Sequence, residues 1–346
     1  MQPLKKSPRF FLPVVAVLAL LLVAGCLWKK NPPRHCERSG IAFGTVARLS
    51  ADGGDAEGAV TECFGKLASL SSEFDAENPE NSITRLNAAA GTGEWVALSP
   101  EVWHILSVSQ AYSERTGGAW DATVAPLSAL WRDALADGVP PSEETIAAAR
   151  EKVDWKKLEL RNADKSARLT ESGMALDLGG AKKGFALDEC RRIYAKHHVT
   201  GLIDLGESSI AAIGEKSGGA PFRIALRHPR EAAPARLGVL PLKNAVLSSS
   251  GDYEHFFISG GIRFHHILDP RTGRPAKAGA ASVFVRIASD EPDAGLVADI
   301  LSTALFVSGA ERGLALLPTF PVHAEAAFTD GTEIFAQTKD FLGNDE

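Results

Sequence analysis

The stretch Leu176–Asp188, LDLGGAKKGFALD, contains the residue types from which an anion-binding turn can be built. We expect a short apolar strand up to Leu178, a break at Gly179-Gly180 and then a helix, because apolar residues recur at helical spacing from Ala186 onward. The N–H groups of a helix N-terminus and a nearby lysine favour a phosphate or carboxylate, and Asp177 adds a carboxylate beside them. P-loop and dinucleotide-binding glycine patterns are absent. A tight turn without a ligand therefore stays open as the alternative.

Oxygen ligands for a cation are found in a second segment. Asp299 and Thr303 stand four residues apart on a predicted helix, Val297–Ser308, and therefore share a face, with Ser302 beside them. A carboxylate and hydroxyls suit a hard cation such as Mg²⁺, which completes its coordination with water and substrate phosphates. An aspartate and a threonine near the start of a helix also serve as caps or solvated groups, so both interpretations stay open.

Two neighbouring histidines and two aromatic residues complete the set. His265-His266 lie in the predicted strand Ile262–Leu268, and a histidine there could act as a general base because its usual pKa is about 6.5. Alternation along a strand sends the two rings to opposite faces, so at most one serves a given site. Phe74 and Trp120 lie in predicted loops, where an aromatic ring stacks on a flat ligand or fills an interface between lobes.

The composition limits the class of protein. The chain has 346 residues, enough for one large domain or two lobes, and its hydrophobic share of 45% is usual for a globular protein. A net charge of −6 argues against nucleic acid as the main partner. Strands and helices do not alternate regularly, which predicts an α+β fold with mixed sheets and packed helices rather than a doubly wound parallel sheet.

The elements that must position these residues are expected as follows. A strand covers Ile41–Leu49, and residues 70–87 form a polar loop. Ser99-Pro100 begins one helix and Ser142 caps another, because these residue types favour helix N-termini. Beyond the glycine turn the chain becomes rich in predicted strands, with a polar turn at Ser248–Tyr253.

The first 25 residues are a predicted targeting segment. Three basic residues precede the apolar run Phe10–Val23, and small residues lead into Cys26. This resembles a bacterial lipoprotein signal, whose cleavage would leave Cys26 as the lipid-bearing N-terminus of a membrane-tethered, periplasm-facing protein. An uncleaved anchor is the alternative. Residues 26–40 are then a polar tether, and loss of residues 1–25 changes the net charge from −6 to −9.

Three further cysteines lie beyond the predicted signal. Cys63 and Cys190 fall on apolar helix faces, and Cys36 leaves an odd number, so we expect free thiols in the core. Their spacing does not suggest a zinc site.

Five motifs in fixed order resemble the FAD:protein FMN transferase family, the ApbE-type flavin transferases. The likeness covers about residues 41–337, and the ordered set is far more specific than any single motif. The motifs are FGT at Phe43–Thr45, SEFD and NSITRLN within Ser72–Asn87, GGAWDATVAPLSALW at Gly117–Trp131, DLGGAKKGFALD at Asp177–Asp188, and SGDYEHF, RFHHILDPRTGRP and ADILSTALF between Ser250 and Phe306.

The resemblance implies a catalytic domain over residues 41–340 with a central flavin site between two lobes. Mg²⁺ would bridge the FAD pyrophosphate, and FMN would pass to a threonine hydroxyl of an acceptor protein, such as a subunit of a membrane redox complex, with release of AMP. His266 matches the histidine that would deprotonate this hydroxyl. The implied metal ligands are the Gly180 carbonyl, Asp299 and Thr303, with Ser302 close by. The implied flavin contacts are Phe43, Phe74, Ala119, Trp120, Asp121, Asp177, Lys183 and Leu268.

The sequence departs from the family pattern at several of these positions. Phe43 replaces a usual methionine and Phe74 a usual tyrosine, while Ala181-Lys182 stands where Ile-Ala is commoner and adds a charge. Gly206-Glu207-Ser208 replaces a frequent Gly-Gly-Asn. Two other functions use the same residues: an FAD pyrophosphatase with water as acceptor, and a flavin-binding lipoprotein without turnover.

Overall fold

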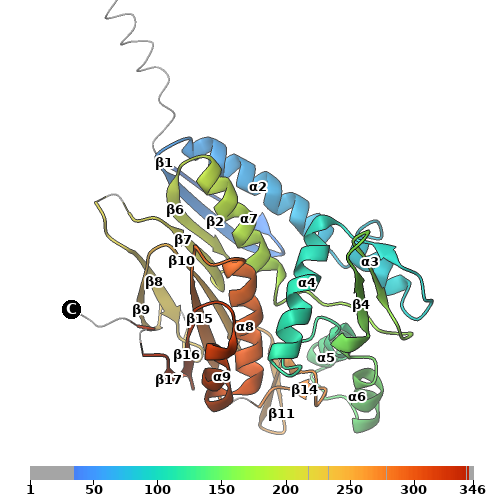
Figure 1. Ribbon diagram of the computed structural model, residues 1–346. Coiled ribbons are helices and arrows are strands. Elements are labelled where there is room, and N and C mark those ends of the chain that lie inside the picture. Colours follow the sequence, from blue (N-terminus) through green and yellow to red (C-terminus); the bar gives the residue numbers. More distant parts are fainter. Residues whose placement is uncertain (1–34, 217, 233, 278, 340, 343–346) are drawn as a thin grey trace, which may run out of the picture.

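The computed structural model describes residues 35–216, 218–232, 234–277, 279–339 and 341–342. Its centre is an eight-stranded sheet in the order β1-β2-β6-β7-β10-β15-β16-β17, in which each strand runs antiparallel to its neighbours (Figure 1). The strands are β1 (His35–Ala42), β2 (Thr45–Asp52), β6 (Thr200–Leu205), β7 (Ser209–Ile213), β10 (Ala245–Gly251), β15 (Ser282–Ala288), β16 (Ala324–Thr329) and β17 (Ile334–Gln337).

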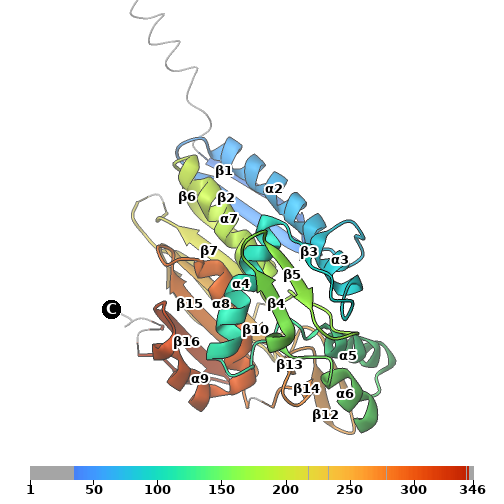
Figure 2. The ribbon, with the colours of Figure 1, turned by 45° about the vertical axis from the view of Figure 1, so that its right-hand side comes forward.

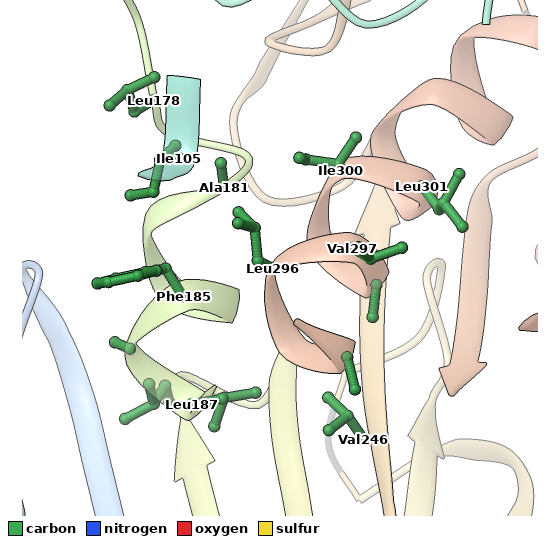
Figure 3. Close-up of a cluster of buried hydrophobic side chains, with 14 of the residues drawn as sticks. Ile105, Leu178, Ala181, Phe185, Leu187, Val246, Leu296, Val297, Ile300 and Leu301 are labelled. Carbon is green, nitrogen blue, oxygen red and sulfur yellow. The ribbon is translucent and has the colours of Figure 1, made fainter. Parts of the chain in front are cut away.

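Three helices cover one face of this sheet: α2 (Ala56–Glu73), α7 (Lys182–Lys196) and α8 (Ala294–Ser308). Helix α8 lies between the sheet, α7 and α4 (Pro100–Arg115), and thirteen of its fifteen residues are buried. Figure 3 shows apolar side chains of α7 and α8 meeting beside Ile105 of α4 and Val246 of β10. The other face of the sheet is covered by the ribbon β8 (Phe222–Arg227)–β9 (Arg236–Leu242).

A second group of elements lies beside this layered body (Figure 2). It contains a three-stranded sheet, two short ribbons and several helices, and a separate apolar cluster around Trp131 holds part of it together. Its members are α3 (Ser82–Ala88), β3 (Val96–Ala97), α5 (Ala125–Asp137), α6 (Glu143–Arg150), the 3₁₀ turn Trp155–Lys157, β4 (Leu158–Arg161), β5 (Ser166–Leu169), β11 (Phe256–Ser259), β12 (Ile262–His265), β13 (Leu268–Asp269) and β14 (Arg274–Pro275). Helix α9 (Ala310–Leu316) and the 3₁₀ turn Leu317–Thr319 follow α8.

The predicted α+β class is confirmed, and the arrangement in two lobes around a flavin site stays a prediction. The sheets are less mixed than expected, since every ladder among the described residues is antiparallel and only the isolated bridge Val124–Ala175 is parallel. Ser99 and Ser142 cap α4 and α6 as predicted. Cys63 and Cys190 are buried and free, again as predicted.

Several local predictions were wrong, each for a physical reason. Strand β1 begins at His35, inside the expected tether. The sequence did not indicate this strand because most of its side chains are exposed and show no apolar alternation. Ser82–Ala88, expected in a loop, is a short helix capped by the Asn81 side chain, which accepts the Thr84 N–H at 2.8 Å. The strand expected before the glycine pair is irregular chain, since its apolar residues are buried there without a ladder.

Two strand ends were also misplaced. Ser248–Gly251 continues β10 rather than forming a turn, because the hydroxyls of Ser248 and Ser250 are satisfied by side chains of α8. Strand β12 ends at His265, and the N–H of His266 instead donates to the carbonyl of His255. The predicted signal and lipid-bearing Cys26 lie outside the described residues. Among the described helices, none has the length and apolarity needed to cross a bilayer.

Candidate active site

The glycine turn before α7 is held against the Trp120 loop. The Asp177 N–H donates to the Ala122 carbonyl at 2.8 Å, and the Asp177 carboxylate accepts the Gly179 N–H at 2.8 Å. A Cβ on Gly180 would lie 2.9 Å from the Thr303 hydroxyl and 2.9 Å from the Trp120 ring. Only a residue without a side chain permits this approach. The structure thus brings the backbone of Gly180 beside Thr303 and Trp120.

The start of α7 leaves backbone donors free. Among the described residues, the N–H groups of Gly180 and Lys183 have no acceptor, whereas those of Ala181 and Lys182 both reach the Leu178 carbonyl at 3.0 Å. Unpaired N–H groups at a helix N-terminus form an anion site. The Lys183 ammonium lies in the same turn and donates to the Ser208 hydroxyl. This geometry favours the anion-binding interpretation over the simple turn.

Helices α7 and α8 cap each other. The Asp299 carboxylate of α8 accepts the Gly184 N–H in the first turn of α7 at 2.6 Å. In return, the Asp188 carboxylate of α7 accepts the Gly295 N–H at 2.9 Å and the Leu296 N–H at 2.9 Å in the first turn of α8. Burial raises the pKa of Asp188. Asp299 is therefore a cap, as one of our interpretations held, but for the neighbouring helix.

The remaining bonds of Asp299 decide whether a cation fits. Its Oδ1 accepts from Ser209 at 2.9 Å and from Ser248 at 2.7 Å, while among the described residues Oδ2 accepts only from Gly184. Since each carboxylate oxygen has about two acceptor positions, Oδ2 keeps one for a cation. The hydroxyl of Ser250 lies 2.9 Å from that of Ser302 and 3.3 Å from that of Thr303.

This donor set suits one particular kind of metal site. It contains one carboxylate, neutral hydroxyls and the backbone of Gly180, all hard oxygen donors. Within the described residues, no cluster of three or more His, Cys, Asp and Glu side chains could hold a metal ion. A cation here would depend on ligand phosphates or water for the rest of its shell, as Mg²⁺ commonly does.

The two histidines have different surroundings. His265 is buried, accepts the Ile267 N–H at 3.2 Å and lies 3.0 Å from the Ala276 carbonyl, so both of its ring nitrogens are engaged. The His266 ring is open to a pocket of about 360 Å³ that Asp177 and Leu268 also line. His266 is thus the one available as a base.

The pocket also sets the protonation state of His266. Protein surrounds the ring on most sides although solvent reaches it, and this desolvation, followed by repulsion from His255 and His265, lowers its pKa to about 4. The His255 and His266 ring centroids lie 5.3 Å apart, nearly perpendicular. At neutral pH His266 is therefore uncharged and able to accept a proton.

The aromatic residues divide into two groups. Phe43, at a φ of +52° in the β1–β2 turn, stacks on Phe74 at 6.4 Å, and Phe74 meets Phe185 of α7 edge-on at 6.2 Å. Phe74 thus fills the interface between that hairpin and α7. Trp120 is 4% exposed, and its indole N–H has no hydrogen-bond partner among the described residues. Such a donor is costly to bury unless a ligand accepts from it.

Asp121 and Ala119 support the Trp120 loop. The Asp121 carboxylate accepts from the Thr123 N–H at 2.7 Å and the Trp155 N–H at 3.0 Å, so both of its oxygens bond within the protein. Burial raises the pKa of Asp121. Ala119 is buried in the main core. These contacts position the loop, and the Asp121 oxygens face protein donors.

The predicted residues therefore form two neighbouring groups joined by the glycine turn. The candidate cation site is surrounded by Trp120, Gly180, Asp299, Ser302 and Thr303. The pocket is lined by Asp177, His266 and Leu268. Sequence reasoning missed the supporting residues Gly184, Ser209, Ser248, Ser250 and His255. The run of serines was the one available signal, and we had interpreted it as a turn.

Comparisons with known proteins fit this geometry. The sequence profile of the ApbE family matches residues 43–328, and the chain therefore belongs to the ApbE family. A Treponema pallidum (strain Nichols) protein named FAD:protein FMN transferase is 28% identical over 334 residues, 91% of this chain and 90% of its own. A Klebsiella pneumoniae (strain 342) protein with the same name is 33% identical over 239 residues, 69% of this chain and 72% of its own.

Solved structures share the fold. The ApbE protein of Thermotoga maritima MSB8 matches with a TM-score of 0.74 at 27% identity, covering 85% of this chain and 94% of that one. The apo form of the Pseudomonas stutzeri flavinyl transferase ApbE matches with a TM-score of 0.75 at 26% identity, covering 90% and 98%. The resemblance seen in the sequence motifs is confirmed.

Proposed function

We propose that this chain transfers FMN from FAD to a threonine hydroxyl of an acceptor protein and releases AMP, in a reaction that depends on Mg²⁺. The observation that carries the proposal is the meeting of Gly180, Thr303 and Trp120 at the N-terminus of α7, next to the pocket of His266. The names of the relatives, FAD:protein FMN transferase, support the transfer of FMN from FAD to a protein.

Each residue has a chemical task in this reaction. The free N–H groups of Gly180 and Lys183, with the Lys183 ammonium, bind the pyrophosphate of FAD. Asp299, Thr303 and the Gly180 carbonyl would hold Mg²⁺, with Ser302 close by. When bound, the ion offsets the charge that develops on the oxygen between the two phosphorus atoms.

Neutral His266 accepts the proton of the threonine hydroxyl. A bond forms between the threonine oxygen and the phosphorus of the FMN half, and the bond from that phosphorus to the bridging oxygen breaks, so that AMP leaves with this oxygen. Asp177 and Leu268, which line the same pocket, contact the flavin half. Phe43 and Phe74 form an apolar wall on the other side of the α7 N-terminus.

We also propose that the chain is anchored through a lipid on Cys26 and faces the periplasm. Its acceptors are then proteins of the same compartment, with subunits of membrane redox complexes as the first candidates. The proposal rests on the sequence before residue 35, where a basic start and an apolar run precede the cysteine.

The test uses purified protein, FAD and Mg²⁺, with and without the soluble domain of a candidate acceptor. Release of AMP that needs the acceptor, with an FMN-sized mass added to one of its threonines, supports the proposal. AMP release of equal rate without an acceptor would identify a pyrophosphatase instead. FAD binding without any AMP would identify a flavin-binding protein without turnover.

A further inference from the structure

The β11–β12 hairpin exposes an unusual share of apolar side chains. Seven large hydrophobic residues are exposed in the described part of the chain, and three of them, Phe256, Ile258 and Ile262, belong to this hairpin. Ile258 is 60% and Ile262 59% exposed. Figure 1 shows the hairpin projecting at the lower edge of the molecule. Single exposed apolar residues are ordinary, but such clusters mark interaction sites.

The base of the same hairpin belongs to the His266 pocket. His255 directly precedes β11, and His266 directly follows β12. Phe257 and Phe264 stack on each other at 5.2 Å, and Phe264 stacks on Trp131 at 5.7 Å, so the inner arms are fixed to α5 and line the pocket. The apolar tip therefore stands directly beyond the proposed base.

Charge and open strand edges add to this surface. The Arg263 guanidinium lies 3.7 Å from the Phe256 ring centroid and donates to the Asp252 carbonyl at 3.5 Å. Within the described residues, neither Arg263 nor Arg132 at the pocket forms an ion pair with a carboxylate. In the described structure β11 and β12 pair only with each other. Because Ser259 and Ile262 flank a two-residue turn, the backbone groups of the next pair along, Ile258 and Arg263, point away from the hairpin.

We propose that the acceptor protein docks on the hairpin surface formed by Phe256, Ile258, Ile262 and Arg263, and that its threonine is carried on an extended segment with apolar and acidic side chains. The proposal rests on the proposed function. The hydroxyl must reach His266, which directly follows the hairpin, and a segment that lies along these arms can bring it there. An extended segment can pair with an open edge while its apolar side chains cover the isoleucines.

The experiment compares the double variant Ile258→Ser/Ile262→Ser with Val139→Ser, which changes a residue that is 63% exposed outside the hairpin. The probe is the soluble acceptor domain that the wild-type chain labels with FMN, together with the same domain carrying valine at the labelled position for binding measurements. We expect the double variant to raise the KM for the acceptor and the Kd for its valine form about tenfold. FAD affinity and acceptor-independent AMP release should stay at wild-type values, and Val139→Ser should match the wild type throughout.

Unchanged KM and Kd in the double variant would overturn the docking proposal while leaving the transferase intact. An equal loss in Val139→Ser would overturn it as well, because the effect would not be specific to the hairpin. If the wild-type chain labels no acceptor but still binds FAD, the proposed function itself fails and the docking proposal fails with it.

Discussion

Replacing Gly184 by alanine tests the hydrogen bond from the Gly184 N–H to the Asp299 carboxylate, which joins the candidate cation site to the glycine turn. Gly184 has helical geometry, so its backbone accepts alanine without strain. An added Cβ, however, would lie 2.1 Å from the Gly295 carbonyl oxygen and 2.6 Å from its carbon. These are backbone atoms of α8 and cannot rotate away like a flexible side chain. The two helices must move apart, and the Gly184 N–H must then leave the Asp299 carboxylate.

The cost can be worked out from these contacts. Forcing an extra methyl group into a packed interface costs about 1–3 kcal/mol. Loss of the hydrogen bond to the Asp299 carboxylate costs about 1.5–3 kcal/mol more. The better helix propensity of alanine offsets about 1 kcal/mol of this destabilisation. We expect Gly184→Ala to lower the free energy of unfolding by about 1.5–5 kcal/mol and the Tm by roughly 2–8 °C.

Urea and thermal unfolding measure this loss, and the matched control is Gly65→Ala. Gly65 lies on an exposed face of α2, and a Cβ there would have no heavy atom within 4 Å. Alanine should stabilise the chain at this position by about 0.5–1 kcal/mol. The half-saturating Mg²⁺ concentration for transfer should rise in Gly184→Ala and not in the control. A Gly184→Ala protein with wild-type Tm and Mg²⁺ dependence would refute the reasoning.

Three further predictions follow from the site. Asp299→Asn should abolish most metal-dependent AMP release, because the carboxylate supplies most of the attraction for the cation. Thr303→Ala should recover part of this release at raised Mg²⁺. Wild-type metal dependence in Asp299→Asn would contradict this prediction. Because the pKa of His266 is lowered to about 4, its neutral form persists in acid, and kcat/KM should hold down to about pH 5 and fall below it. An acid limb near pH 6.5 that survives in His266→Gln would assign the base elsewhere. Cys26→Ser should leave an uncleaved protein without lipid by mass spectrometry, and normal processing would exclude the lipoprotein signal.

The sequence predicted best those features whose signals are local. Ser99 and Ser142 cap their helices through atoms three residues away, and the apolar stripe of α7 lies within one helix. Both kinds of pattern can be recognised without knowing the fold. The order of the motifs indicated the family, and the match to the family profile confirms it.

The features that sequence reasoning missed depend on contacts between residues that are far apart in the sequence. Nothing near Asp299 indicates that its carboxylate caps α7, because the partner Gly184 is distant in sequence. The serines of β10 resembled a turn since their polarity is compensated only by α8. Strand β1 lies at the edge of the sheet, and because most of its side chains are exposed its sequence shows no strand pattern. The support that Asp121 gives to its loop likewise depends on a residue distant in sequence, because its carboxylate accepts the Trp155 N–H.

The reciprocal caps also have a consequence for the timing of protein synthesis. Gly184 and Asp299 are 115 residues apart, and Asp188 and Gly295 are 107 apart. At about 5–20 residues per second, a ribosome needs roughly 5–20 seconds to make the chain between them. During that interval α7 has emerged with its first turn uncapped and no carboxylate from α8 beside it. The cation-binding face can therefore form only after α8, which ends at Ser308, has been synthesised.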